Sequence, residues 1–152
     1  MTPTLLGRVQ TRLFLALHFG VPATLVMMLA VGDLFVDPEK LAFWKLPNLF
    51  AYVVAVGLVL DPVYIGLQRL RWDRDWPFAF QLAGSVAEAG VVYAIHGQDW
   101  FPNVKMHPDD AWIFPIHFAL MFVPSFLFLL GPMKVLFPRW RFAGGQLIGG
   151  VK

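Results

Sequence analysis

The sequence predicts an all-α integral membrane protein that folds as a four-helix bundle with proline-kinked helices. Four apolar segments are each about 20 residues long, which is the length that an α-helix needs to cross a bilayer. Of the 152 residues, 58% are hydrophobic and only 14% are charged, outside the range of soluble globular proteins. Short polar connections separate the segments, so we expect residues 1–152 to form a single transmembrane domain.

The first predicted helix spans about residues 12–34, follows a short polar N-terminal segment and contains Pro22. The second spans about residues 46–70 and contains Pro62. A proline removes a backbone donor and bends a helix, so bent helices could hold open a cavity. The alternative is that proline is simply common in membrane helices.

The third predicted helix spans about residues 77–96. Only the short link 71–76 separates it from the second, so these two helices should be antiparallel neighbours. The fourth predicted helix spans about residues 111–136 and contains Pro115 and Pro124. We expect the glycine-rich tail that follows it to be frayed.

Basic residues gather at one end of the predicted bundle. With four spans, that end holds the N-terminus, the second connection and the tail, with Arg8, Arg12, Arg69, Arg71, Arg74, Lys134, Arg139, Arg141 and Lys152. The opposite end holds Lys40, Lys45 and Lys105. Because cytoplasmic loops carry an excess of Lys and Arg, we expect both termini to be cytoplasmic.

Two carboxylates, Asp61 and Glu88, lie inside apolar helices. Tyr64 shares the helical face of Asp61, while Ser85 and Gln81 share the face of Glu88. An ionisable residue inside a membrane helix is costly, so it normally faces the bundle interior or a wet cavity. We therefore expect the two faces to line one polar pocket near the middle of the membrane.

Two carboxyl groups in a low-dielectric site should not both be ionised, so the expected state is one shared proton, or one protonated acid with one base. Such a pair could move protons in a reaction or hold a cationic amine. The alternative is structural, with Asp61 capping backbone at the Pro62 kink and Glu88 bonding a neighbouring helix. The catalytic candidates are Glu88 and Asp61, and the ligand-binding candidates are Tyr64, Gln81, Ser85, His18 and Ser125.

Several classes of site are not expected. The chain has no cysteine, so disulfides and thiolate metal sites are unavailable, and we expect no metal and no cofactor. His18 and His117 are each read as hydrogen-bonded packing residues rather than metal or porphyrin ligands. The net charge of +2 is too small and too scattered for nucleic-acid binding, and we see no cleavable signal peptide.

The chain also resembles the EXPERA family, the group of the emopamil-binding protein and the sigma-2 receptor. The matching residues are Trp76-Pro77-Phe78-Ala79-Phe80-Gln81-Leu82, Ser85-Val86, His107-Pro108, Trp112, Phe118-Ala119-Leu120, Val123-Pro124, and Val21-Pro22-Ala23-Thr24-Leu25 with Met27. The resemblance covers roughly residues 13–136 and implies four helices around a lipid-accessible cavity for sterols or other hydrophobic, often amine-bearing, ligands. The catalytic residues of the family's sterol isomerases do not carry over to this chain.

Two functions follow from these observations. The first is binding of a hydrophobic, sterol- or isoprenoid-like small molecule in an intramembrane cavity, with an isomerase or cyclase working by proton transfer as its catalytic form. The alternative is a non-catalytic accessory subunit of a larger respiratory or photosynthetic membrane complex. A weaker third idea is a proton-conducting protein. Expected partners are membrane lipid, the small molecule, and either a second copy or a membrane-complex partner.

Overall fold

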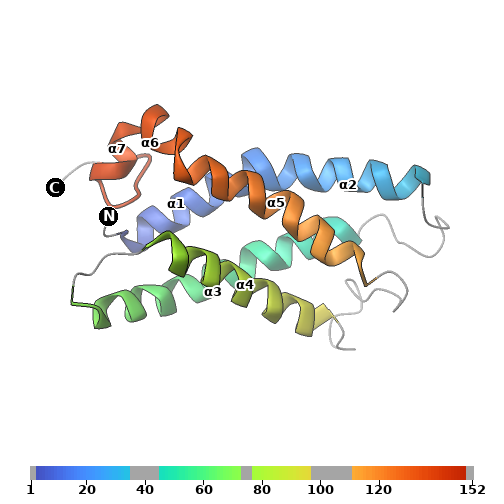
Figure 1. Cartoon of the computed structure of the whole chain (residues 1–152), viewed down its shortest axis with the longest axis horizontal. Coiled ribbons are helices and arrows are strands. Elements are labelled where there is room, and N and C mark those ends of the chain that lie inside the picture. Colours follow the sequence, from blue (N-terminus) through green and yellow to red (C-terminus); the bar gives the residue numbers. More distant parts are fainter. Residues whose placement is uncertain (1–2, 35–44, 73–76, 97–110, 150–152) are drawn as a thin grey trace.

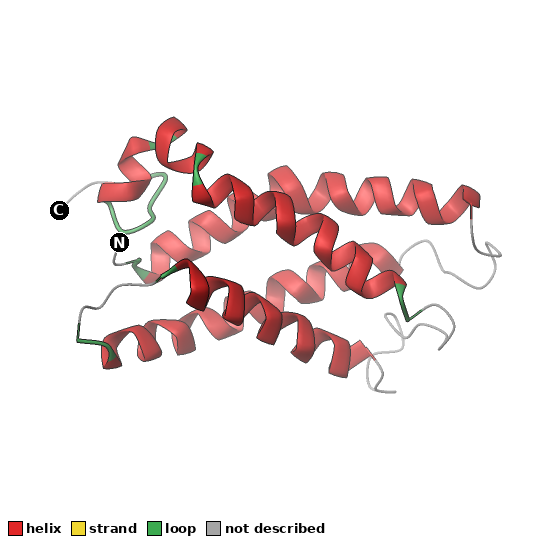
Figure 2. Cartoon of the chain, viewed as in Figure 1, coloured by secondary structure: helices red, strands yellow, loops and turns green. Residues whose placement is uncertain are grey.

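The computed structural model describes residues 3–34, 45–72, 77–96 and 111–149, and within these ranges every regular element is helical (Figure 2). The elements are α1 Leu5–Leu15, a π-helical turn Ala16–Gly20, α2 Val21–Leu34, α3 Lys45–Leu70, α4 Phe78–His96, α5 Ile113–Leu130, α6 Pro132–Leu136 and α7 Pro138–Phe142. Four stretches are long and apolar enough to cross a membrane by length and composition: Leu5–Val31, Lys45–Leu70, Phe78–Ile95 and Ile113–Leu130. The predicted all-α helical bundle and its four candidate spans are confirmed.

The four spans run back and forth along the long axis of the molecule (Figure 1). α1 and α2 form one long rod, and α3 and α4 are antiparallel and packed on each other. The start of α1, the end of α3, the start of α4 and the short helices α6 and α7 all lie at one end of the bundle. We call this the terminal end, and its cytoplasmic location stays a prediction.

The first span begins earlier than expected. α1 starts at Leu5 rather than near residue 12, because Thr4 caps it by accepting a hydrogen bond from the Gly7 amide at 3.1 Å. Residues 5–11, which were expected to belong to a polar N-terminal segment, are therefore helical. The span then widens into the π-helical turn Ala16–Gly20, where the Val21 amide donates to the Ala16 carbonyl. A π turn directly before Pro22 gives room for a residue that cannot donate a backbone hydrogen bond.

Two of the other prolines lie inside continuous helices. Pro62 is internal to α3 and Pro124 is internal to α5, and the bend expected at each of them stays a prediction. Pro115 is instead the third residue of α5, in the first turn, where a missing amide donor costs little.

The C-terminal segment is folded, so the expectation of a frayed tail is wrong for residues up to 149. The fourth long helix ends at Leu130 rather than 136, and α6 and α7 follow after Gly131. The side-chain oxygen of Gln10 accepts hydrogen bonds from the Leu147 and Ile148 amides at 2.7 and 3.1 Å. Gly7 allows the close approach, since a Cβ there would overlap the carbonyl oxygen of Gly144. The tail thereby closes over the start of α1.

Two apolar clusters hold the bundle together. One lies toward the end away from the termini and contains Met27, Val31, Leu46, Leu49, Val92, Ile113 and Phe114. The other lies at the terminal end and contains Leu129, Met133 and Trp140. Outward-facing side chains are apolar as well, such as Leu29 at 70% and Val59 at 73% exposure, as expected of helices that contact lipid. The bundle interior also holds buried polar side chains, among them Asp61, Gln68 and Glu88.

Candidate functional site

An ion-pair network joins three helices inside the bundle. Arg12 of α1 lies between Asp61 of α3 and Glu88 of α4. Its Nε and Nη2 donate to Oδ2 and Oδ1 of Asp61 at 3.1 and 2.9 Å. Its Nη1 and Nη2 donate to Oε2 and Oε1 of Glu88, both at 2.9 Å. Each carboxylate is therefore bound through both oxygens, a geometry that suits the planar guanidinium and that a lysine ammonium cannot reproduce.

The network is largely removed from solvent and lipid. The side chains of Asp61 and Glu88 are 1% and 7% exposed, and that of Arg12 is 22% exposed. Buried ions are tolerated when they are paired and hydrogen-bonded, and here one cation neutralises one of two anions. Arg8, one turn earlier on α1, supplies a second positive charge beside Tyr64, with its Cζ 5.9 Å from the ring centroid.

A guanidinium lies between the two carboxylates, an arrangement that the sequence analysis did not anticipate, and the proton expected on these acids stays a prediction. The sequence analysis placed Arg12 at the very start of the first helix, where a polar N-terminal segment ends. Since α1 begins at Leu5, Arg12 is about 10 Å along the span and its long side chain reaches both acids. Arg8 and Arg12 are four residues apart, on one helical face, and this was the signal that two buried acids had a counter-ion nearby.

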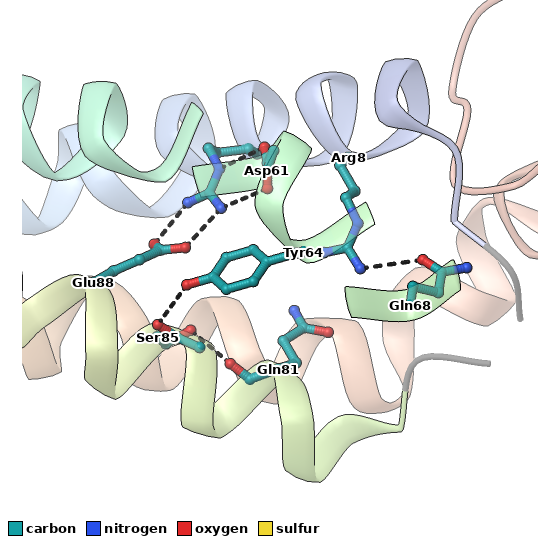
Figure 3. Close-up of polar contacts among 9 residues, drawn as sticks. Arg8, Asp61, Tyr64, Gln68, Gln81, Ser85 and Glu88 are labelled. Atoms are coloured by element: carbon teal, nitrogen blue, oxygen red, sulfur yellow. Dashed lines mark hydrogen bonds and ion pairs between the residues drawn. The ribbon is translucent and has the colours of Figure 1, made fainter. Parts of the chain in front are cut away.

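Three of the predicted ligand-binding residues surround the acids (Figure 3). The Tyr64 ring extends from α3 toward α4, beside Asp61 and Glu88. Its hydroxyl donates to the Gly84 carbonyl at 3.0 Å, and a Cβ on Gly84 would lie only 3.2 Å from the ring. Ser85 donates to the Gln81 carbonyl of its own helix at 3.0 Å. The two helical faces predicted from the sequence therefore do meet.

These side chains line a cavity of about 600 Å³ between the spanning helices. The polar wall includes both acids together with Tyr64, Gln81 and Ser85, and Ser125 of α5 lines the cavity opposite them. Ser125 donates to the Met121 carbonyl at 2.7 Å. Whether any of these residues binds a ligand stays a prediction, but the structure brings six of the seven candidates to one space.

His18 is the candidate that the structure does not bring to the cavity. It lies on the π-helical turn with an exposed side chain and is absent from the cavity wall. Its Nδ1 is 2.8 Å from the Phe14 carbonyl oxygen, and its ring stacks on Phe14 at 4.1 Å. The widened turn directs the ring outward, which periodicity counted on a regular helix does not anticipate.

The same cavity has an aromatic wall, whose residues were not among the candidates predicted from the sequence. Phe118, Phe122 and Phe126 line the cavity from α5, and adjacent ring centroids are 5.7 and 5.4 Å apart. Phe78 of α4 meets Phe126 edge-on at 6.3 Å. The spacing of four residues places Phe118, Phe122 and Phe126 on one face of α5. That spacing could have been recognised in the sequence as an aromatic face.

His117 is a buried packing residue outside the cavity wall. Its Nε2 lies 2.9 Å from Thr24 Oγ, which itself donates to the Gly20 carbonyl at 2.8 Å. Since the single hydroxyl proton of Thr24 goes to Gly20, the imidazole must donate through Nε2. The pair ties α5 to α2. In the described ranges, no group of three His, Asp or Glu side chains could hold a metal ion.

No known protein family, curated protein or solved structure matches this chain. The resemblance to the EXPERA family consequently stays a prediction, and the site is interpreted from its own geometry. That geometry combines an ion-pair network with a cavity that is lined by both polar and aromatic side chains. Such a space suits a molecule with both apolar and polar parts.

Proposed function

We propose that this multi-pass membrane protein binds a hydrophobic small molecule, sterol- or isoprenoid-like in character, in its intramembrane cavity. The observation that carries the proposal is the 600 Å³ cavity between the spanning helices. Small-molecule sites typically measure about 300–1,000 Å³ and combine apolar walls with a few convergent polar groups. The three stacked phenylalanines and the polar wall meet both conditions.

The geometry favours binding over proton transfer. Asp61 and Glu88 each accept two hydrogen bonds from Arg12, so both acids are engaged as partners of that guanidinium. An isomerase or cyclase acting through these acids would first have to break the ion pairs. We therefore limit the proposal to binding.

Mass spectrometry of lipids extracted from the purified protein tests the proposal. We expect one hydrophobic compound to co-purify with the parent chain. A Ser125→Phe variant should lose it, because the added ring would occupy the cavity that Ser125 lines. Val123→Phe is the matched control, since Val123 is on the same helix, is 49% exposed and does not line the cavity.

The proposal is wrong if the folded Ser125→Phe variant retains the compound as well as Val123→Phe does. It is also wrong if the parent chain carries no compound beyond bulk lipid. Circular dichroism establishes that each variant keeps its helices. Protein partners that co-purify in stoichiometric amounts, without any bound compound, would favour the accessory-subunit alternative instead.

A further inference from the structure

The charges that line the cavity are unequal. Its described wall contains four cationic side chains and two acidic ones, which leaves a formal charge of +2: Arg8, Arg12, Lys134 and Arg141 against Asp61 and Glu88. A cavity with excess positive charge attracts anions and repels cations. The balance therefore opposes the amine-bearing ligand that two buried acids alone would suggest.

The two acids are also already paired with a cation of the chain itself. All four carboxylate oxygens accept hydrogen bonds from Arg12 at 2.9 to 3.1 Å. An amine beside these acids would compete with a guanidinium that already binds both oxygens of each carboxylate. The acids accordingly act as internal counter-ions of α1.

The cations at the terminal end are differently placed. Lys134 of α6 is half-buried, and Arg141 of α7 is exposed. Neither has a carboxylate partner in the part of the chain that the structure describes, and each lies over an aromatic ring. Both line the cavity, so their charges can reach a ligand there.

A continuous row of aromatic contacts leads inward from Lys134. Its Nζ lies 4.5 Å from the centroid of Phe78, which meets Phe126 at the end of the aromatic wall. The wall continues through Phe122 to Phe118. Eight residues along α5 give this row a length of about 12 Å. A positive group at one end and stacked rings beyond it match a charged head and an apolar chain.

We infer that the cavity binds a single-chain amphiphile with an anionic head group, a carboxylate or a phosphate. The head group contacts Lys134 and Arg141 at the terminal end, and the chain lies along Phe126, Phe122 and Phe118. This inference rests on the proposed function, and it narrows the ligand class by the sign of its charge.

Four probes with the same saturated chain test the inference: hexadecanoate, hexadecyl phosphate, hexadecanol and hexadecylamine. Binding to the full chain in non-ionic detergent is followed by tryptophan fluorescence. We expect the two anions to bind about tenfold more tightly than the alcohol, as charge-assisted hydrogen bonds imply, and the amine to bind most weakly.

Paired variants locate the head group. Lys134→Gln combined with Arg141→Gln should reduce the preference for anions over the alcohol to about threefold or less. Arg139→Gln is the matched control, because Arg139 is an exposed cation of α7 that does not line the cavity. It should leave the preference unchanged.

The outcomes separate the two proposals. Equal affinity for all four probes, or tightest binding of the amine, overturns the inference and leaves the proposed function standing. If Arg139→Gln also loses the preference for anions, the inference is overturned, because the preference then reflects the general surface charge. Displacement of hexadecyl phosphate by inorganic phosphate at similar concentration would assign the site to a free anion and contradict an amphiphile. Failure of every probe to bind overturns the inference too, whereas the proposed function is overturned only if the Ser125→Phe variant retains the co-purified compound or the parent chain carries none.

Discussion

Replacing Arg12 by methionine tests whether the ion-pair network holds the bundle together. Methionine keeps much of the volume of the side chain and removes its charge and all four hydrogen bonds. Asp61 and Glu88 would then face each other without a cation between them, in a site where they are 1% and 7% exposed. We expect Arg12→Met to be the most damaging single substitution in the polar interior.

The expected loss can be estimated from the structure. Hydrogen bonds between membrane helices contribute about 0.6 kcal/mol each, so four of them amount to about 2.4 kcal/mol. Removing one partner of a buried ion pair leaves an uncompensated charge and typically costs about 3–5 kcal/mol. The unpaired charge therefore decides the magnitude, and we expect the variant to lose about 3–5 kcal/mol of unfolding free energy. Arg12→Lys keeps the charge but cannot bind both oxygens of each carboxylate. Its loss of unfolding free energy should therefore be smaller, about 1–2 kcal/mol.

Unfolding in detergent by a denaturing surfactant, followed through the fluorescence of the six tryptophans, measures these losses. If charge is the cause, neutralising the acids in the triple variant with Asp61→Asn and Glu88→Gln should recover at least half of the loss. Arg139→Met is the control for removing a cation from the exposed surface. The reasoning is refuted if Arg12→Met is as stable as Arg139→Met, or if the triple variant is less stable than Arg12→Met alone.

Two further predictions concern the packing around the network and the orientation of the chain. Gly57→Ala should destabilise the bundle by about 1–3 kcal/mol in the same unfolding assay, because its Cβ would overlap the Arg12 guanidinium, whereas Gly66→Ala has open space and should be neutral or slightly stabilising. Equal effects of the two alanines would contradict this account. Because the chain has no native cysteine, Trp72→Cys and Trp112→Cys can be labelled singly. The two tryptophans are 94% and 42% exposed, and they lie just after the end of α3 and just before the start of α5, which are at opposite ends of the bundle. A membrane-impermeant thiol reagent should label Trp112→Cys on intact cells and Trp72→Cys only after permeabilisation, and the reverse pattern would refute cytoplasmic termini.

The spans could be predicted because hydropathy is a local property. The second and third helices, expected over 46–70 and 77–96, are found at Lys45–Leu70 and Phe78–His96. The first helix was predicted too short because residues 1–11, with Arg8 and with Arg12 directly after them, were taken as a short polar N-terminal segment. An arginine paired with interior acids is compatible with a membrane helix, and only the tertiary structure supplies those partners.

The polar faces of the second and third spans were predictable for a related reason. Asp61 with Tyr64, and Glu88 with Ser85, each share a face by helical periodicity alone. The tie to Arg12 was not predictable in the same way, because it joins residues 49 and 76 positions apart and depends on the rotation of three helices. Gly57 offered a partial hint: a glycine one turn before a buried acid leaves space for another side chain.

The sign of the ligand's charge depends on where each cation lies in the membrane. A cationic amine beside Asp61 would have to give up its hydration deep in the span, where Arg12 already satisfies the acid. An anionic head group at Lys134 and Arg141 would instead stay at the terminal end of the bundle, near the depth at which lipid head groups meet water. Its chain alone would enter the apolar part of the cavity. The positive-inside bias and a head-group site are compatible for these two cations, since both place positive charge at the membrane surface.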